Sequence, residues 1–227
     1  GKTESFLMPI LAQIFKEMHS PLHKWKPIKP NVKKENYWNK ENIEHVNYRI
    51  NESRPSAIRA MVIYPMNALV EDQMHRMRKA LCSEDADNFF KNYCGGNRIY
   101  IGRYNSSTPS SKKKNTENGR IKKSDHKEMY DEMRKLETFS QKLKEADFEN
   151  NSDWQYSFPM PVSSDKTLNS SELVSRWDMQ ETPPDIFITN FSMLSILLMR
   201  SHESNIFEAT KRWLNGDDLT KDGIKPE

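Results

Sequence analysis

Apolar residues recur at helical spacing in three stretches of the chain. The first is residues 2–19, where Pro9 lies inside the pattern and should kink the helix. The second is residues 67–81, where Asn67 stands at the position of a helix N-cap. The third is "FSMLSILLM" at 191–199. The apolar face of the first helix consists of Phe6, Leu7, Ile10, Leu11, Ile14, Phe15 and Met18.

Three short runs with the pattern of buried strands precede or separate these helices. They are "IRAMVIY" at 58–64, "RIYIGRY" at 98–104 and "DIFITN" at 185–190. Strands alternating with helices are typical of an α/β domain with a parallel sheet and flanking helices. In such sheets ligands bind at the carboxyl ends of the strands. The residues that leave each strand are therefore the first place to look for function.

Two long polar stretches, 20–57 and 106–182, interrupt the regular pattern. Charged residues make up 30% of the 227 residues, and the mean hydropathy is -0.90. We interpret both stretches as insertions, lids or disordered segments, with a charged helix at about 124–147 in the second. The lysine run at 112–114 reads as a solvated loop, with nucleic-acid contact as the alternative.

Composition narrows the class of protein only a little. The net charge of +3 is too small to argue for nucleic acid by itself. Cys82 and Cys94 form neither a metal-binding spacing nor a disulfide framework, which favours a reducing, cytoplasmic setting. No apolar run approaches the roughly 20 residues of a membrane span, and no signal peptide is expected.

The opening "GKTESFLMPIL" (1–11) has the order of the second half of a phosphate-binding loop. Such a loop presents backbone N–H groups to an anion at a helix N-terminus. It also needs a lysine for the β- and γ-phosphates and a hydroxyl for Mg²⁺. Lys2 and Thr3 stand in these positions. The alternative is an ordinary helix N-terminus.

Two further stretches turn from a strand into a helix with polar residues at the junction. In "IYPMNALVEDQ" (63–73), Asn67 could cap the helix or bond a phosphate, and Gln73 lies one and a half turns further on. In "PPDIFITNFSML" (183–194), Thr189 and Asn190 place a hydroxyl and an amide side chain directly before the predicted helix at 191–199. Taken singly, each is also explained as a helix cap.

These three stretches, in this order, resemble motifs I, Ia and Ic of the first RecA-like domain of superfamily 2 DEAD/DEAH-box helicases. Glu4 and the Tyr-Pro-x-x-Ala-Leu form of the second motif are similar to the Lhr-like and YprA-like bacterial branch. The run 175–194 also resembles large bacterial helicases associated with phage defence. The expected fold is accordingly a partial RecA-like P-loop domain over residues 1–227, with two long polar insertions.

The resemblance implies a site residue by residue. The nucleotide would be ATP with Mg²⁺: Gly1, Lys2, Thr3 and Glu4 would line its site, Lys2 and Thr3 being catalytic and Thr3 the Mg²⁺ ligand. The nucleic-acid backbone, with DNA favoured over RNA, would be contacted by a second set. That set consists of Pro65, Asn67, Ala68, Leu69, Gln73, Thr189 and Asn190.

For some other residues the correspondence with helicase positions is less direct. Arg103 and Asn105 lie near the place of a further backbone-contacting loop of such helicases. Arg176 and Trp177 precede the third motif and are interpreted as structural. No Asp-Glu-x-His or Asp-Glu-Ala-Asp sequence is present, and "GDDL" at 216–219 reads as a loop.

The leading hypothesis is therefore part of an ATP-dependent helicase or translocase whose acidic motif and second RecA-like domain lie elsewhere in the parent chain. We expect the isolated chain to hydrolyse ATP very slowly or not at all. A non-catalytic nucleic-acid or protein-binding module on the same scaffold is the alternative. A different P-loop ATPase, such as a transporter or kinase, is disfavoured because it gives the second and third motifs no role.

Overall fold

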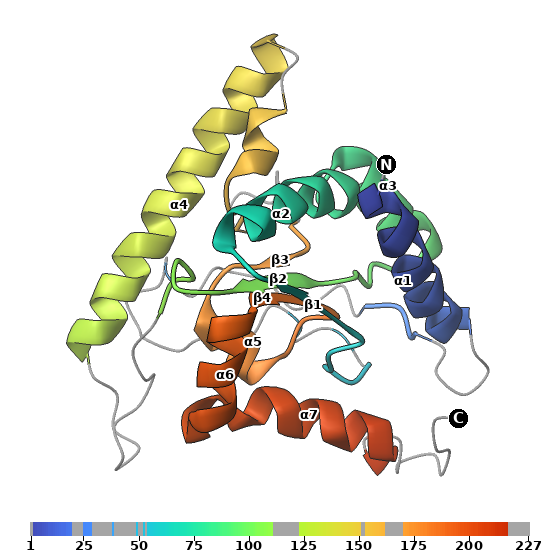
Figure 1. Ribbon diagram of the computed structural model, residues 1–227. Coiled ribbons are helices and arrows are strands. Elements are labelled where there is room, and N and C mark those ends of the chain that lie inside the picture. Colours follow the sequence, from blue (N-terminus) through green and yellow to red (C-terminus); the bar gives the residue numbers. More distant parts are fainter. Residues whose placement is uncertain are drawn as a thin grey trace.

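A four-stranded, all-parallel sheet forms the centre of the molecule, in the order β1-β4-β2-β3 (Figure 1). This confirms the α/β class and the parallel sheet. The strands are β1 (Ala60–Tyr64), β2 (Ile101–Tyr104), β3 (Glu172–Leu173) and β4 (Ile186–Asn190). The computed structural model describes residues 2–19, 25–28, 38, 49, 52, 54–110, 123–150, 153–161 and 170–217.

Helices cover both faces of the sheet. Helices α1, α2 and α3 lie on one face, whereas α4, α5, α6 and α7 pack against the other (Figure 1). Short 3₁₀ turns, η2 (Trp154–Ser157) and η3 (Ser201–Glu203), precede β3 and α7. The helices are α1 (Lys2–His19), α2 (Asn67–Leu81), α3 (Glu84–Tyr93), α4 (Lys123–Asn150), α5 (Arg176–Glu181), α6 (Phe191–Met199) and α7 (Ser204–Asn215).

The sequence of β4 explains why the sheet is buried on both sides. Ile186 and Ile188 belong to the core beneath α1 and α2, whereas Phe187 belongs to the core on the opposite face. Successive side chains of a strand point to opposite faces, so a central parallel strand must be apolar at every position. The uninterrupted apolar run "IFI" at 186–188 is the sequence signal of such a central strand.

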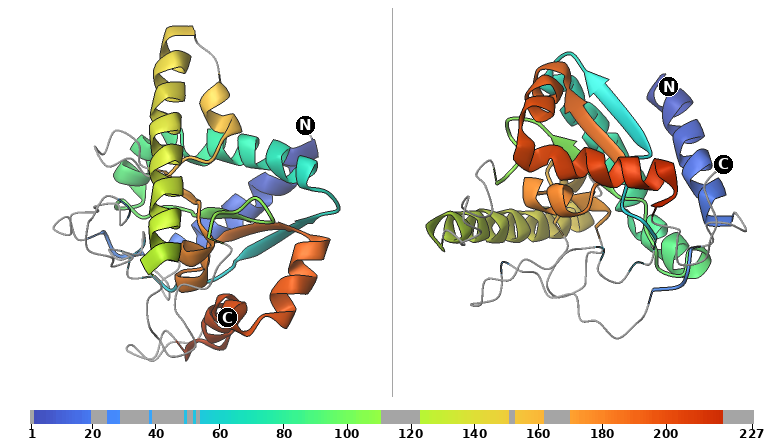
Figure 2. Two further views of the ribbon diagram at one scale, coloured as in Figure 1. Left: turned by 90° about the vertical axis from the view of Figure 1, so that its left-hand side faces the viewer. Right: turned by 90° about the horizontal axis from the view of Figure 1, so that it is seen from below.

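Part of the second polar stretch, 106–182, belongs to the sheet and the core, although its polar composition predicts an insertion. It contains the expected charged helix, which is observed as α4 and extends beyond the body of the molecule (Figures 1 and 2). It also supplies the edge strand β3 and helix α5, whose Trp177 is buried in the core. The expectation of a lid or disordered segment is therefore wrong for residues 170–182. The lysine run at 112–114 lies outside the described residues.

The first polar stretch, 20–57, also contributes to the core. Trp25 and Trp38 are buried, and the Trp38 indole donates to Glu137 on α4 at 2.7 Å. Arg49 and Arg54 are buried as well. A low overall hydropathy hides these few buried side chains, because each is surrounded in sequence by polar residues. Among the described residues, no helix is long and apolar enough to cross a membrane.

Asp185, whose carboxylate is buried, connects the amino ends of three strands. Its backbone carbonyl accepts from the Ala60 N–H, at the start of β1, at 2.9 Å. Its Oδ2 accepts from the Tyr100 N–H, just before β2, at 2.8 Å, and Asp185 itself leads into β4. Asp185 thus joins β1, β2 and β4 at their amino ends, which lie opposite to the carboxyl ends of the strands.

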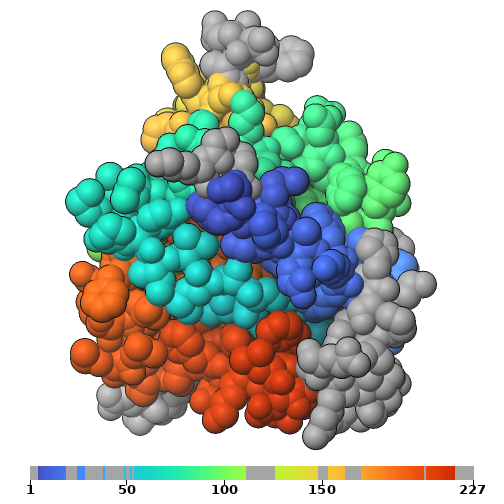
Figure 3. All heavy atoms as spheres, turned by 45° about the vertical axis from the view of Figure 1, so that its right-hand side comes forward, coloured from blue at the N-terminus to red at the C-terminus, as the bar shows by residue number. Residues whose placement is uncertain are grey.

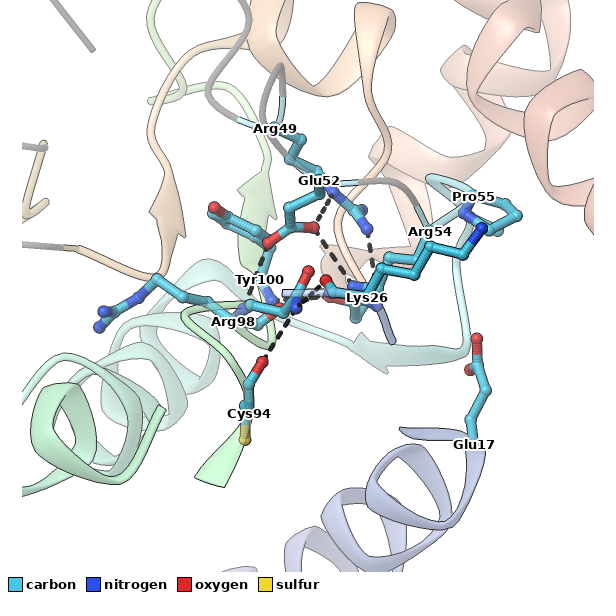
Figure 4. A network of polar contacts seen from close by, with 12 residues as sticks. Glu17, Lys26, Arg49, Glu52, Arg54, Pro55, Cys94, Arg98 and Tyr100 are labelled. Carbon is cyan, nitrogen blue, oxygen red and sulfur yellow. Dashed lines mark hydrogen bonds and ion pairs between the residues drawn. The ribbon is translucent and has the colours of Figure 1, made fainter. Parts of the chain in front are cut away.

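Three arginines neutralise this carboxylate. Arg54 makes a two-pronged contact with both Asp185 oxygens, at 2.7 and 2.6 Å, and Arg59 donates to Oδ1 at 2.9 Å. Arg49 lies 4.0 Å from Oδ1. Figure 4 shows the adjoining carboxylate, Glu52, which accepts from Arg49 and Arg54 at 3.1 and 3.2 Å. We call Asp185, Glu52 and these arginines the Asp185 cluster.

Electrostatics within the cluster favour the ionised carboxylate. Burial alone would raise the pKa of Asp185, but the charges of Arg54, Arg49 and Arg59 outweigh burial and hold that pKa well below its usual range. The carboxylate side chain has no exposed surface, so water screens these interactions little. Asp185 is therefore ionised at neutral pH.

We predict that Asp185→Asn lowers the free energy of unfolding by about 3 kcal/mol, because guanidinium charges are left buried without their partner. The measurement is urea unfolding followed by tryptophan fluorescence. The control is Asp131→Asn on α4, which removes an exposed pair with Arg134 and should change stability by less than about 1 kcal/mol. Equal effects of the two variants would contradict the role given to Asp185.

The same cluster predicts a loss of stability in acid. The folded-state pKa of Asp185 lies below the ordinary value of 3.8 for an aspartate carboxyl, so its ionised form stabilises the fold at neutral pH. That stabilisation should be lost progressively as the pH falls below about 4 and through the folded-state pKa. Unfolding free energies measured between pH 7 and pH 2 should therefore decline more steeply for the wild type than for Asp185→Asn. Parallel pH profiles would count against this.

Candidate functional site

The carboxyl ends of β1, β2 and β4 lie side by side. In the strand register, Tyr64 of β1 pairs with Asn190 of β4, and Tyr104 of β2 pairs with Thr189. The residues that leave these strands are consequently neighbours in space, although they are far apart in the sequence. This is the edge at which parallel sheets bind their ligands.

Three polar side chains meet at this edge. The Asn190 Nδ2 donates to the Asn67 Oδ1 at 2.5 Å, and the Asn67 Nδ2 donates to the Ser106 Oγ at 3.4 Å. Each comes from a different strand end: Asn67 follows β1, Ser106 follows β2 and Asn190 ends β4. We call Asn67, Ser106 and Asn190 the amide edge. The sequence predicts that the three strand-to-helix junctions form one anion-lined surface, and the structure brings two of them together through Asn67 and Asn190. The Thr3 side chain of the third junction lies outside the described residues.

The beginning of α2 differs from the prediction in one respect. Asn67 does not cap this helix; it is the first helical residue, and Met66 is the N-cap residue without a side-chain hydrogen bond to the helix. Pro65, Ala68 and Leu69 are exposed around it. Because Asn67 lies one position too late to cap, its amide is turned instead to Asn190. The first N–H groups of α2 thus have no side-chain cap and lie in an exposed segment.

The beginning of α6 shows the opposite arrangement. The Asn190 Oδ1 accepts from the Met193 N–H at 2.7 Å, which is a side-chain N-cap. This leaves the Asn190 Nδ2 as the group that reaches Asn67. Asn190 therefore holds α6 in place and orients Asn67 at the same time. Two helix N-termini, one capped and one open, converge on the amide edge.

Thr189 has a structural position. Its side chain is 0% exposed, and its Oγ1 donates to the Tyr104 carbonyl oxygen at 2.6 Å. The hydroxyl closes the end of the β2–β4 pair, so in this conformation it is not available to a nucleic-acid strand. Gln73 is similar: it lies on the buried face of α2 and donates to the neighbouring Asp72 at 3.1 Å. The structure brings neither side chain to the surface of the amide edge.

The remaining motif residues support the loop after β2. Arg103 binds Glu71 of α2, and Asn105 is fully buried, its Oδ1 accepting from the Ser107 N–H at 3.0 Å. The Asn105 carbonyl oxygen accepts from Arg176 at 2.7 Å, while Trp177 is buried in the core. Arg176 and Trp177 are structural, as the sequence indicates. Arg103 and Asn105 shape the loop that carries Ser106.

The predicted nucleotide-binding residues are described only in part. Lys2, Thr3 and Glu4 begin α1, which confirms the helix, but their side chains and all of Gly1 lie outside the described residues. In both views of Figure 2 the N-terminal end of α1 is directed toward the end of the sheet at which β1 finishes. The ATP and Mg²⁺ sites stay predictions.

No group of three or more His, Cys, Asp or Glu residues in the described part of the chain has the arrangement of a metal site. In the "GDDL" segment, Gly216 ends α7 with a positive φ of 75°, which favours glycine. Asp217 continues in a 3₁₀ conformation, and the two residues after it lie outside the described residues.

Two features of this site escaped the sequence prediction. Ser106 is not among the predicted residues, although its place directly after a strand is a usable signal. Asp185 is predicted only as the first residue of a strand. Nothing local indicates its partners, because Arg49 and Arg54 lie in the first polar stretch and Arg59 in the first predicted strand, all far upstream. Long-range ion pairing of this kind has no periodicity that a sequence pattern can reveal.

Comparison with known proteins gives one relative. The chain is 28% identical, over 249 aligned residues, to Druantia protein DruE of Escherichia coli (strain UMEA 4076-1). The alignment covers 97% of this chain but only 12% of DruE. No protein-family model matches the chain, and no solved structure is significantly similar to it. The chain is thus related, along nearly its whole length, to one segment of a much longer Druantia protein.

Proposed function

We propose that the parent protein is an ATP-dependent helicase or translocase and that the amide edge of this domain contacts the backbone of a nucleic-acid strand. The observation that carries the proposal is the convergence of Asn67, Ser106 and Asn190 at the carboxyl end of the sheet, beside the open N-terminus of α2. Two of these residues belong to motifs that resemble those of superfamily 2 helicases.

The chemistry of the amide edge suits a phosphate–sugar backbone. Exposed N–H groups at a helix N-terminus favour an anion, and neutral amides donate hydrogen bonds to phosphate oxygens without reading the bases. A motor that moves along a strand requires contacts of this sequence-independent kind. Asn67 is exposed and held in place by Asn190, so little side-chain freedom would be lost on binding.

ATP would bind at the other motif. In the proposal Lys2 approaches the β- and γ-phosphates and Thr3 holds Mg²⁺, both at the N-terminus of α1. The acidic residues and the second RecA-like domain that complete such a site would come from the rest of the parent chain. The relation to a segment of DruE, and the resemblance to helicases associated with phage defence, support a large bacterial parent protein of this class.

We predict opposite effects of Asn67→Asp on stability and on binding. A carboxylate in the first turn of α2 should stabilise the helix by about 0.3–1 kcal/mol, and it still accepts from Asn190. The same negative charge should lower the affinity of the parent for single-stranded DNA about tenfold or more, because in the proposed complex the carboxylate would repel the phosphate oxygens of the strand. Thermal unfolding and fluorescence anisotropy at constant salt measure the two effects.

The control is Asn88→Asp, which changes an exposed asparagine on α3 and should leave the affinity nearly unchanged. If Asn67→Asp binds DNA as tightly as the wild type does, the amide edge is not a nucleic-acid contact.

A separate variant tests the motor half of the proposal. In the parent protein, Lys2→Ala should abolish ATP hydrolysis, because the charge on the transferred phosphoryl group loses its nearest cation. Most of the nucleic-acid binding should remain, since Lys2 lies in the nucleotide motif. The measurements are steady-state ATPase activity with and without DNA, and anisotropy. Undiminished turnover would remove the assignment of Lys2 to the nucleotide site.

A further inference from the structure

An exposed aromatic ring directly follows the amide edge in the sequence. Phe191 comes after Asn190 as the first residue of α6, and it is 69% exposed. It belongs to none of the hydrophobic cores in the described part of the chain. The same helix also exposes Ile196, Leu198 and Met199. Large apolar side chains that gather at the surface mark a contact with another molecule, because burial in the fold does not account for them.

The residue that orients the amide edge also sets the position of this ring. The Asn190 Oδ1 accepts from the Met193 N–H at 2.7 Å, and the Asn190 Nδ2 donates to Asn67. The backbone of Phe191 is thus held close to Asn67, and only its two side-chain torsions stay free. In Figure 3 the cyan and teal surface of β1 and α2 adjoins the orange surface of the β4–α6 segment. A strand whose backbone lies on the amide edge would therefore have a phenyl ring within reach of its bases.

Stacking on a base is the contact that a phenyl ring can add at such a site. Proteins that bind single strands combine backbone contacts with aromatic side chains on which bases stack, and every base has a suitable face. The amides of the edge bond to phosphate oxygens, which paired and unpaired strands both present. A paired base must first be taken out of its duplex, whereas an unpaired base is available at little cost. An aromatic ring beside a backbone contact would therefore select single strands.

The rest of the exposed surface of α6 is aliphatic and lies further from the amide edge. Leu198 stands about two turns beyond Phe191 on the same side of the helix, and it is 69% exposed as well. A protein partner packed along α6 would use both side chains alike. A base of a strand bound at the amide edge would meet the aromatic ring first. The position of the one exposed aromatic residue of α6, next to Asn190, favours the base.

We infer that Phe191 stacks on an unpaired base of the strand whose backbone contacts the amide edge, and that this contact selects single-stranded nucleic acid. The inference rests on the proposed nucleic-acid contact of Asn67 and adds a contact with the base to it. Phe191 is then a binding residue with no part in ATP hydrolysis. A protein partner along α6 is the competing occupant.

Single substitutions in the full-length parent give the first test. The probe is single-stranded oligothymidylate, and the measurement is fluorescence anisotropy at constant salt. Phe191→Ala should weaken binding about five- to a hundredfold, the effect of losing one base stacked on an aromatic ring. Phe191→Trp should bind at least as tightly as the wild type, because it presents a larger ring. Wild-type affinity of Phe191→Ala would overturn the inference.

Leu198→Ala is the matched control, since Leu198 is on the same helix and equally exposed. It should leave the affinity for oligothymidylate nearly unchanged. Both variants should keep the thermal unfolding midpoint of the wild type, because neither side chain is in the core. If Leu198→Ala weakens binding as much as Phe191→Ala does, α6 is a general apolar contact surface and the inference is wrong.

A strand without bases separates stacking from every other contact. An abasic oligonucleotide keeps the sugar–phosphate backbone, so the wild-type parent should bind it more weakly than oligothymidylate. Phe191→Ala should cause no further loss of affinity for the abasic strand or for duplex DNA, because neither offers a base to the ring. Equal losses on the abasic strand and on oligothymidylate would show that the ring touches no base, which would overturn the inference.

Asn67→Asp distinguishes a failure of this inference from a failure of the proposed backbone contact. It should weaken the binding of the abasic strand and of oligothymidylate by the same factor, because it acts on phosphates. If Asn67→Asp weakens both and Phe191→Ala weakens neither, the amide edge binds the backbone without a stacked base, and only the inference fails. If neither variant weakens binding, the proposed contact fails and the inference fails with it.

Discussion

The Asp185 cluster is the constraint on which the site depends. Asp185 joins the amino ends of β1, β2 and β4, through its backbone carbonyl at β1 and its carboxylate at β2, and the carboxylate pairs with Arg54 and Arg59. With the strands aligned at one end, their register sets which residues meet at the other. The register of β1 against β4, which begins at the hydrogen bond from the Ala60 N–H to the Asp185 carbonyl, brings the residues after the two strands, Asn67 and Asn190, into contact.

The division of roles at the amide edge follows from burial. Thr189 is buried and bonds the end of β2, and Gln73 lies on the buried face of α2. Asn67, in contrast, is exposed. Asn190 serves two partners, one with each end of its amide. Residues of one sequence motif therefore do different work: some build the edge, and others present hydrogen-bond donors at it.

The sequence predicts part of the regular structure, because periodicity is a local property. The helices at 2–19, 67–81 and 191–199, the charged helix at about 124–147 and the three longer strands are found in this way. β3 is not predicted because its two residues carry no period, and α3, α5 and α7 are not among the predicted helices either. The contact between Asn67 and Asn190 required the register of β1 against β4, and the Asp185 cluster required pairing across more than a hundred residues. Neither leaves a mark in any short window of the sequence.

The most direct test is a structure of the parent protein bound to single-stranded DNA and a non-hydrolysable ATP analogue. The account predicts a phosphate oxygen about 2.7–3.2 Å from the Asn67 amide or from the first N–H groups of α2, with Asn190 still bonded to Asn67. A strand that crosses another face of the domain, with this edge left in solvent, would contradict it.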